Sequence, residues 1–206
     1  MRFRICTRAD CKTLSQIAYA CASGDSEGFT YKLGPRFLEA YYLSVVEEPH
    51  SVVLVAVDEK TETVVGFAAG TANAGAGMEA LRKRRVRLAW AAARGLVRSP
   101  SLLRGALQRY RVTRNRQEAG RYIVTSGGRA IYWGMMPAHR GGNQAIVLFK
   151  KWLEIMRVLG VRQIGMEVDQ ANTRAQSLHS HLGAAVKEAI TTPEGKQRLM
   201  MEYILD

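Results

Sequence analysis

The stretch Met135-Met136-Pro137-Ala138-His139-Arg140-Gly141-Gly142-Asn143-Gln144-Ala145 decides how the fold of this chain is interpreted. It follows an apolar, strand-like run, Ala130 to Trp133, and opens an amphipathic helix. The first N–H groups of a helix have no partner within the helix, and the helix dipole favours an anion there. Glycines let the backbone approach such a ligand closely, because a Cβ would stand in the way. The stretch therefore predicts a binding site for a diphosphate.

The sequence that follows predicts a helix, a strand and a second helix. The first helix ends at Gly160 and carries apolar residues at the spacing of one buried face. These residues are Ala145, Leu148, Phe149, Trp152, Leu153 and Met156. A strand-like run covers 161–168, and a short helix with Asn172 and Ala175 leads to Gly183.

The rest of the chain predicts further strands and helices. Alternating and helical spacings indicate a strand over 2–9, helices over 14–22 and 35–48, and hairpins over 51–70 and 185–205. Together with the stretch above, they predict a chain that mixes strands and helices throughout.

The order strand, loop, helix, strand, asparagine, helix, glycine resembles the GNAT superfamily of acetyl-coenzyme A-dependent N-acetyltransferases. The resemblance implies an α/β (α+β) fold in which helices flank a mixed, mostly antiparallel central sheet. Arg140 and Ala145 match the ends of the family's phosphate loop. Asn143 stands where the family has a glycine, and Ala184 stands where an aromatic residue is common.

The resemblance also implies a site for acetyl-coenzyme A, used as a co-substrate. Main-chain groups of the strand would hold the pantetheine arm, and amides of the loop would hold the diphosphate. The residues implied for this site are Met135, Met136, Arg140, Gly141, Gly142, Asn143, Gln144, Ala145, Asn172 and Ala175. Asn172 also suits the cap of the helix that follows it, and the two roles are compatible.

His179 stands where the family often has a tyrosine that protonates the departing thiolate. It is the candidate catalytic acid, because a histidine can donate a proton near neutral pH. The competing interpretation is a half-buried helical histidine without a chemical role.

The acceptor side is less well defined. The resemblance implies that Phe29, Tyr31 and Tyr41 line the acceptor pocket. The strand over 130–134 carries no carboxylate, so the proton acceptor is left open between a chain of water molecules and a loop residue such as Glu27 or His50.

Composition agrees with one domain over residues 1–206. A chain of 206 residues with 47% hydrophobic content can bury a substantial core. Cys6, Cys11 and Cys21 lack the spacing of a metal site, which predicts free thiols and no metal. The sequence has no signal-peptide pattern and no apolar run long enough to span a bilayer, so we expect a cytoplasmic protein.

The formal net charge of +12 is concentrated over residues 82–121, where arginines meet almost no acid except Glu118. The segment 75–127 is longer than the family's usual connection and predicts an inserted pair of basic helices over 78–97 and 101–116. Such a field attracts anions, so peripheral contact with an acidic membrane or another polyanion is a candidate partnership. No nucleic-acid-binding motif is present.

The resemblance implies direct transfer of an acetyl group from acetyl-coenzyme A to a primary amine. The expected acceptor is a small molecule such as an amino-sugar nucleotide, whose phosphates would suit the basic segment. One alternative is acetylation of a protein or peptide amine. The other is a non-catalytic module that binds coenzyme A and is anchored to acidic membrane or nucleic acid.

Overall fold

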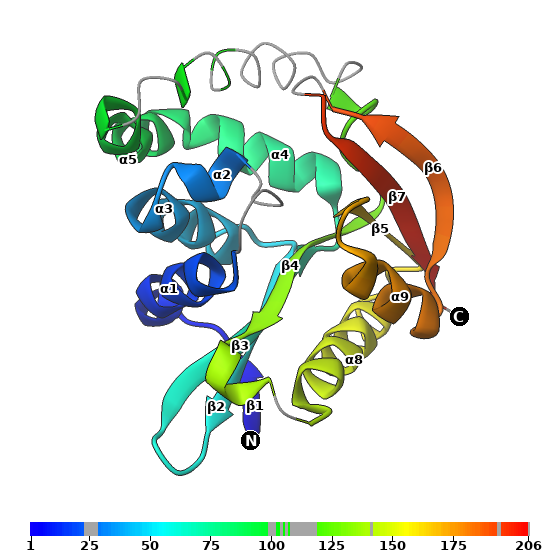
Figure 1. Ribbon diagram of the computed structural model, residues 1–206. Helices are drawn as coiled ribbons and strands as arrows, with labels where there is room; N and C mark the ends of the chain where they lie inside the picture. The colour runs from blue at the N-terminus through cyan, green and yellow to red at the C-terminus, as the bar shows by residue number, and fades with distance from the viewer. Residues whose placement is uncertain are drawn as a thin grey trace.

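The computed structural model describes most of the chain, and Figure 1 shows its elements. The described residues are 1–22, 29–98, 102–103, 105, 107, 119–140, 142–192 and 195–205, with the backbone alone described for Phe29, Arg94 and Arg98. The strands are β1 (Arg2–Ile5), β2 (Ser51–Asp58), β3 (Thr63–Thr71), β4 (Gly128–Met135), β5 (Gln163–Asp169), β6 (Ala185–Thr191) and β7 (Gln197–Ile204). The helices are α1 (Cys11–Cys21), α2 (Phe29–Lys32), α3 (Pro35–Val46), α4 (Ala74–Lys83), α5 (Arg85–Arg98), α8 (Gln144–Val158) and α9 (Thr173–His181), and short 3-10 helices cover Arg8–Asp10 and Pro137–His139.

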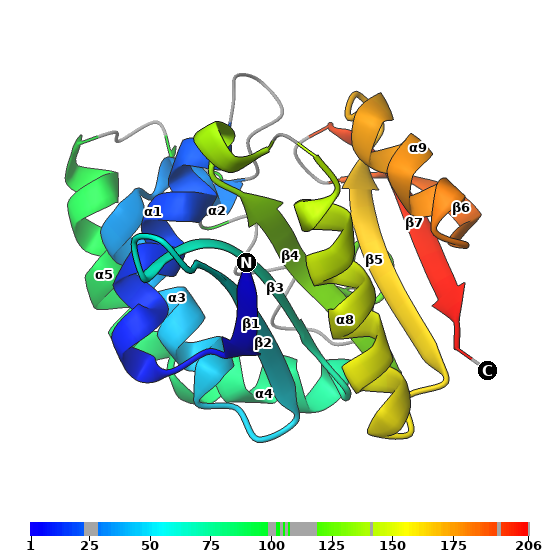
Figure 2. The same cartoon turned by 90° about the horizontal axis from the view of Figure 1, so that it is seen from below.

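In the described part of the chain the strands form a seven-stranded sheet in the order β1-β2-β3-β4-β5-β7-β6. Neighbouring strands are antiparallel, except that β4 and β5 are parallel. Helix α8 covers one face of the sheet, and α1 and α3 cover the other (Figures 1 and 2). This confirms the predicted mixed, mostly antiparallel sheet flanked by helices. The predicted end of α8 is confirmed as well, since Gly160 follows it with a φ of 79°.

The core on the α8 side is built around Trp152, whose side chain is fully buried. Its Nε1–H donates to the carbonyl of Val52 in β2 at 3.0 Å, and its ring stacks on Phe149 with centroids 5.6 Å apart. The indole fits because β3 has a glycine beneath it. A Cβ at Gly70 would lie 2.2 Å from the Trp152 ring and 2.5 Å from the carbonyl oxygen of Arg129.

The first strand is shorter than predicted. The expectation of a strand over 2–9 is wrong beyond Ile5, because the carboxylate of Asp10 turns the chain. It accepts hydrogen bonds from the N–H and the hydroxyl of Thr7, at 2.7 and 2.8 Å. Arg4 binds both oxygens of the same carboxylate, and this hydrogen bonding lowers the pKa of Asp10 to about 2.

The segment predicted as a basic helical insertion, 75–127, also differs from its prediction. The single helix expected over 78–97 is broken at Arg84, which leaves the helical conformation (φ −95°, ψ 13°) between α4 and α5. Its guanidinium donates to both the carboxylate and the carbonyl of Glu47, at the end of α3. The break lets α5 turn and pack on α3, through Ala92 against Leu33 and Phe37. The helix predicted over 101–116 lies largely outside the described residues.

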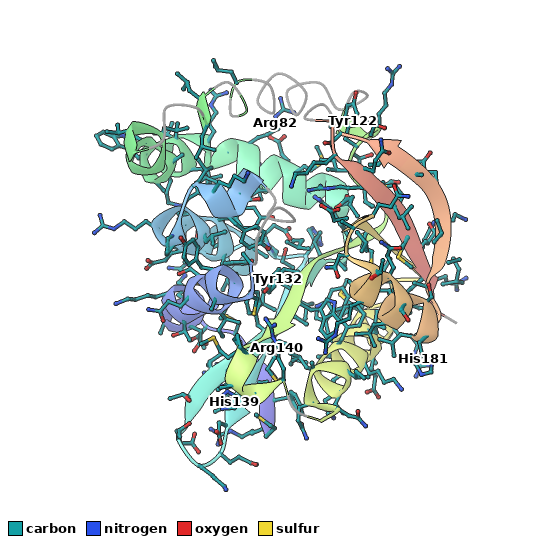
Figure 3. All side chains as sticks on the ribbon, in the orientation of Figure 1. Arg82, Tyr122, Tyr132, His139, Arg140 and His181 are labelled. Carbon is teal, nitrogen blue, oxygen red and sulfur yellow. The ribbon has the colours of Figure 1, made fainter. Side chains whose placement is uncertain are left out.

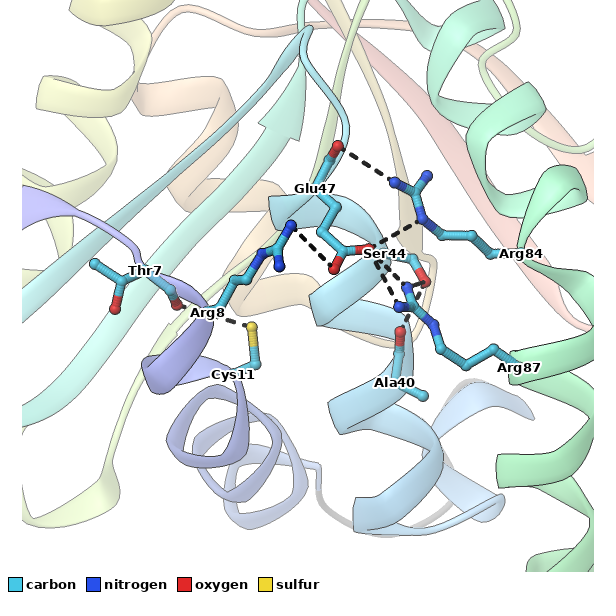
Figure 4. A network of polar contacts seen from close by, with 8 residues as sticks. All are labelled: Thr7, Arg8, Cys11, Ala40, Ser44, Glu47, Arg84 and Arg87. Atoms are coloured by element: carbon cyan, nitrogen blue, oxygen red, sulfur yellow. Dashed lines mark hydrogen bonds and ion pairs between the residues drawn. The ribbon is translucent and has the colours of Figure 1, made fainter.

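Glu47 also corrects the expectation that the basic segment meets almost no acid. Its carboxylate accepts hydrogen bonds from Arg84 at 3.2 Å and from Arg87 at 3.1 and 3.2 Å, and Arg8 lies 3.6 Å away (Figure 4). Arg87 also donates to the hydroxyl of Ser44 at 2.7 Å. Glu47, an acid distant in sequence from these arginines, therefore neutralises part of the positive charge of the basic segment and binds the segment to the end of α3.

We predict that Gly70→Ala destabilises the protein by about 3 kcal/mol or more, because the new methyl group overlaps both the Trp152 ring and a main-chain oxygen. Urea unfolding followed by circular dichroism measures this loss. Gly77→Ala, in α4, is the control. Its methyl would meet the Thr71 side chain at 3.2 Å, and a helical alanine gains about 1 kcal/mol over glycine, so the two effects nearly cancel. Equal stability of the two variants would contradict the packing described for Gly70.

Candidate functional site

Strands β4 and β5 pair over only two positions. Gly128 lies opposite Ile164 and Arg129 lies opposite Gly165. Beyond these positions the facing edges of β4 and β5 are unpaired, while β3 continues along the other edge of β4 and β7 along the other edge of β5. The register between β3 and β4 shifts at this point, so Ile131 forms a bulge that turns β4 away. In Figure 2, α8 lies in front of the two strands, with β4 on one side and β5 on the other. The sheet thus contains a wedge whose closed end lies at Arg129.

The helix that starts beside the open end of this wedge has an exposed N-terminus. Gly142, Asn143 and Gln144 are all exposed, and Gly142 has a φ of 81° with no atom within 4 Å of the position of an added Cβ. Among the described residues, no acceptor takes the amides of Gly142 to Ala145, and the Asn143 side chain does not cap the helix. Fifteen residues of α8 align their dipoles behind these amides. The start of α8 therefore suits an anion, as the sequence predicts, although Gly141 lies outside the described residues.

Arg140 ties the loop to the end of β4. Its Nε–H donates to the carbonyl of Met135 at 3.0 Å, and the thiol of Cys21 donates to the same oxygen at 3.2 Å. Figure 3 shows Arg140 at this end of the strand, next to His139. The main-chain groups of Met136 are also used, since its N–H donates to Val65 and its carbonyl accepts from His139, both at 2.8 Å. Contacts of Met135 and Met136 with a pantetheine arm stay predictions, and these internal bonds weigh against Met136.

A buried ion pair lies at the closed end of the wedge. Arg129 donates to one carboxylate oxygen of Glu167 at 2.9 Å, and the amide of Val124 donates to the other at 2.6 Å. The side chains of Met166 and Val168 belong to the core under α8, so Glu167 between them points to the opposite face, the side of α1 and α3. Its side chain is 7% exposed. This carboxylate was not predicted from the sequence, although a lone acid within an apolar strand was visible.

A small cavity of about 20 Å³ adjoins Arg129, which is room for about one water molecule. It is lined by Tyr41, Ser44, Val45, Glu48, Ser51, Thr71, Ala74, Gly77, Met78, Leu81, Arg129 and Ile131. The buried carboxylate of Glu48 accepts hydrogen bonds here from Ser51 at 2.6 Å and Thr71 at 3.3 Å. The buried Nε of Arg129 has no partner within the described residues. Because α4 supplies four of the lining residues, α4 covers this part of the sheet.

The predicted acceptor residues lie partly together. Tyr31 approaches Tyr132 of β4 with ring centroids 6.2 Å apart, and burial raises the pKa of Tyr31 above its ordinary value. Tyr41 lines the cavity beside Arg129, and the side chain of Phe29 is not described. The position of Tyr132 was not predicted from the sequence, because a bulge at Ile131 breaks the alternation that indicates which face of the sheet a strand residue lies on.

The environment of His179 favours the interpretation in which this histidine has no chemical role. The side chain is buried, and desolvation lowers its pKa to about 4, so the ring is neutral at pH 7. Trp133 donates from Nε1 to Nε2 of His179 at 3.2 Å, and Nδ1 lies 2.9 Å from the hydroxyl of Tyr203. Because an indole can only donate, Nε2 is an acceptor and the ring proton sits on Nδ1. Both nitrogens are thus occupied. The role of His179 as a catalytic acid stays a prediction, and this geometry weighs against it.

Asn172 caps α9, as the sequence predicts. Its Oδ1 accepts a hydrogen bond from the amide of Ala175 at 3.1 Å. The roles of both residues toward coenzyme A stay predictions, since the Ala175 amide is already bonded inside the protein.

The sequence and the structure were compared with known proteins. No protein-family model matches the sequence, and no curated protein matches it. Solved structures match over nearly the whole chain. A GNAT phosphinothricin acetyltransferase from Sinorhizobium meliloti, solved with acetyl-coenzyme A, is 14% identical over 99% of this chain and 88% of its own, with a TM-score of 0.62. The ribosomal-protein-alanine N-acetyltransferase of Brucella melitensis is 16% identical over 100% of both chains, with a TM-score of 0.61.

A variant of the spermidine N-acetyltransferase of Vibrio cholerae matches as well, at 12% identity over 100% of this chain and 95% of its own, with a TM-score of 0.59. Identities this low establish the fold and leave the activity open. The chain has the fold of the GNAT acetyltransferases, as predicted from the stretch Met135 to Ala145. None of the helices in the described part of the chain has the length and hydropathy of a membrane span.

We predict that His179 makes stability depend on pH between about 6.5 and 4. Its pKa is lowered from 6.5 to about 4 in the folded protein, so its contribution is complete above pH 6.5 and is lost as the pH falls through 4. This difference corresponds to about 3 kcal/mol. His179→Gln keeps an acceptor for Trp133 and a donor for Tyr203 but does not titrate. Unfolding measured across this range should give a flatter pH profile for the variant. Identical profiles would show that the buried imidazole does not resist protonation.

Proposed function

We propose that this protein transfers an acetyl group from acetyl-coenzyme A to a primary amine of a small molecule, with an amino-sugar nucleotide as the leading candidate. The observation that carries the proposal is the parting of β4 and β5 after Arg129, beside the exposed start of α8. Parted strands can offer main-chain groups to an amide-containing arm, and the helix start can offer N–H groups to a diphosphate. Solved proteins of this fold, such as the Sinorhizobium meliloti enzyme, hold acetyl-coenzyme A.

The residues that would hold the co-substrate lie in the loop before α8. Amides of Gly142 to Ala145 would bind the diphosphate, and the guanidinium of Arg140, fixed by Met135, would add a positive charge beside them. Asn143 replaces the family glycine without blocking the site, because its side chain is exposed and does not cap the helix. These features fit a negatively charged, extended ligand.

For the chemistry, the chain must orient the amine, accept its proton and stabilise charge on the thioester oxygen. A main-chain N–H of β4 is suited to the last task, because a preorganised donor costs little reorganisation. Glu167 is our candidate to hold the amine and receive its proton, since it lies on the same face of the sheet as Tyr31 and Tyr41. Arg129 and Val124 fix its two oxygens, and each oxygen has a second lone pair for the amine, unlike the nitrogens of His179. Orientation alone can supply roughly 7–11 kcal/mol of rate enhancement in favourable cases.

The residues around the wedge, rather than the fold, would determine which amine is the acceptor. The three solved relatives are named for phosphinothricin, a ribosomal-protein alanine and spermidine, so the shared fold accepts very different amines. In this chain α4 lies over the sheet beside Arg129, which favours a small acceptor over a bulky one. The basic residues of the insertion suit a phosphate-bearing molecule. Acetylation of a protein amine and binding without turnover are the competing outcomes.

We predict that Gly142→Ala weakens the binding of acetyl-coenzyme A at least about 10-fold and so reduces the thermal stabilisation by this ligand. An alanine is strained at a φ of 81°, and its methyl group would disturb the diphosphate loop. Thermal unfolding over a series of ligand concentrations measures this effect. Gly160→Ala is a matched control at the other end of α8. Its φ is 79° and its surroundings are equally open, so it strains the backbone similarly. If both variants respond to the ligand alike, α8 does not bind the diphosphate.

We predict that Glu167→Gln lowers turnover of a responsive amine by about 100-fold or more, as expected for loss of a proton-accepting group. Thiol release from acetyl-coenzyme A, screened with an amine library, finds the acceptor and measures the rate. Glu59→Gln, at an exposed carboxylate on the β2–β3 turn, is the control. Unchanged turnover in Glu167→Gln would remove Glu167 from the mechanism. Absence of thiol release with every amine, despite binding of acetyl-coenzyme A, would favour the non-catalytic module.

A further inference from the structure

Helix α5 is apolar on two opposite faces. On its inner face, Ala92 is buried and packs with Leu88 and Leu96 against residues of the α2–α3 region. The contact is close, since a Cβ at Gly95 would lie 2.6 Å from the carbonyl oxygen of Leu33. Together with the ion pairs to Glu47, this packing fixes which face of α5 points outward.

The outer face carries an apolar stripe formed by Val86, Trp90, Ala93 and Val97. Spacings of four, three and four residues place these side chains along one side of a helix. Val86, Trp90 and Val97 are 66%, 78% and 80% exposed. Single exposed apolar residues are ordinary on a protein surface, but a continuous stripe with a tryptophan indicates an interaction surface. By contrast, Trp152 of this chain is fully buried.

Positive charge lies beside the stripe. Arg82, Lys83 and Arg85 are exposed where α4 meets α5, and Arg82 has a distant ion pair with Glu79 at 3.7 Å. The whole chain carries a formal net charge of +12. Basic residues are attracted to an anionic membrane surface, and an indole ring prefers the boundary between apolar and polar regions.

We propose that the outer face of α5 docks on an anionic lipid bilayer, with the stripe entering the interface and the basic residues contacting lipid headgroups. Charge and apolar contact distinguish an anionic bilayer from the other candidate partners of this face. A second copy of this chain would bring two positively charged surfaces together, and a nucleic acid would leave Val86 and Val97 without apolar partners. An anionic bilayer satisfies both parts of the surface at once.

The position of α5 is compatible with a working site on a docked protein. Helix α5 lies outside α3, on the opposite side of the sheet from α8 (Figures 1 and 2). Docking through α5 therefore leaves the start of α8 accessible to ligands from solution. The proposed docking requires no acetyl-coenzyme A, so it stands or falls independently of the transferase function.

Vesicle binding of the full chain tests the proposal. We expect the protein to float with vesicles of phosphatidylcholine and phosphatidylserine, but not with phosphatidylcholine alone, and to dissociate as salt is raised. Tryptophan emission should shift to shorter wavelength on binding, and Trp90→Ser should remove the shift. Trp90→Ser should also weaken binding at least about 10-fold, since it removes the largest apolar side chain of the stripe.

Matched control variants test whether binding depends on the stripe or is non-specific adsorption. Val158→Ser removes a side chain that is 79% exposed on α8, and binding should not change. Arg85→Glu should weaken binding more than Arg162→Glu, which reverses another exposed charge outside this segment. Absence of binding to phosphatidylserine vesicles, or equal binding by Trp90→Ser and the natural chain, overturns the proposal. A Trp90-dependent change of oligomeric mass in solution without vesicle binding also overturns it, in favour of a second copy.

Discussion

The limited pairing of β4 with β5 is the constraint on which the rest of the structure depends. Two paired positions at Gly128 and Arg129 hold the two halves of the sheet together, and the bulge at Ile131 then turns β4 away. Beyond that point, the main-chain groups on the facing edges of β4 and β5 must find another partner, be hydrated or bind a ligand. At the end of β4, Met135 and Met136 find partners inside the protein. The start of α8, beside the same opening, has none among the described residues.

The elements of this region could be predicted from the sequence because local signals agree there. The apolar spacing of α8, its stop at Gly160, and the cap at Asn172 each have a short-range cause. Residues that depend on long-range contacts could not be predicted. Glu167 has a role only because Arg129 and Val124 meet it across the fold, and the break at Arg84 depends on Glu47 of another helix.

The two interpretations of His179 show what a sequence motif can and cannot predict. The sequence places a histidine where a proton donor is expected, but it does not reveal the surroundings of that side chain. The structure surrounds the ring with Trp133, Phe149 and Tyr203, and burial lowers its pKa. The position of a residue in a motif and its protonation state are therefore separate questions, and only the second depends on the whole fold.

The carboxylate of Glu47 contacts arginines from two segments, Arg8 before α1 and Arg84 and Arg87 of the insertion. An acid at the end of α3 thus joins the basic segment that follows β3 to the helices on one face of the sheet. Any change at this position would act on both attachments simultaneously. Without this carboxylate, three guanidinium groups would lie close together with no negative charge between them, while the packing of α5 on Leu33 and Phe37 would still hold the segment in place.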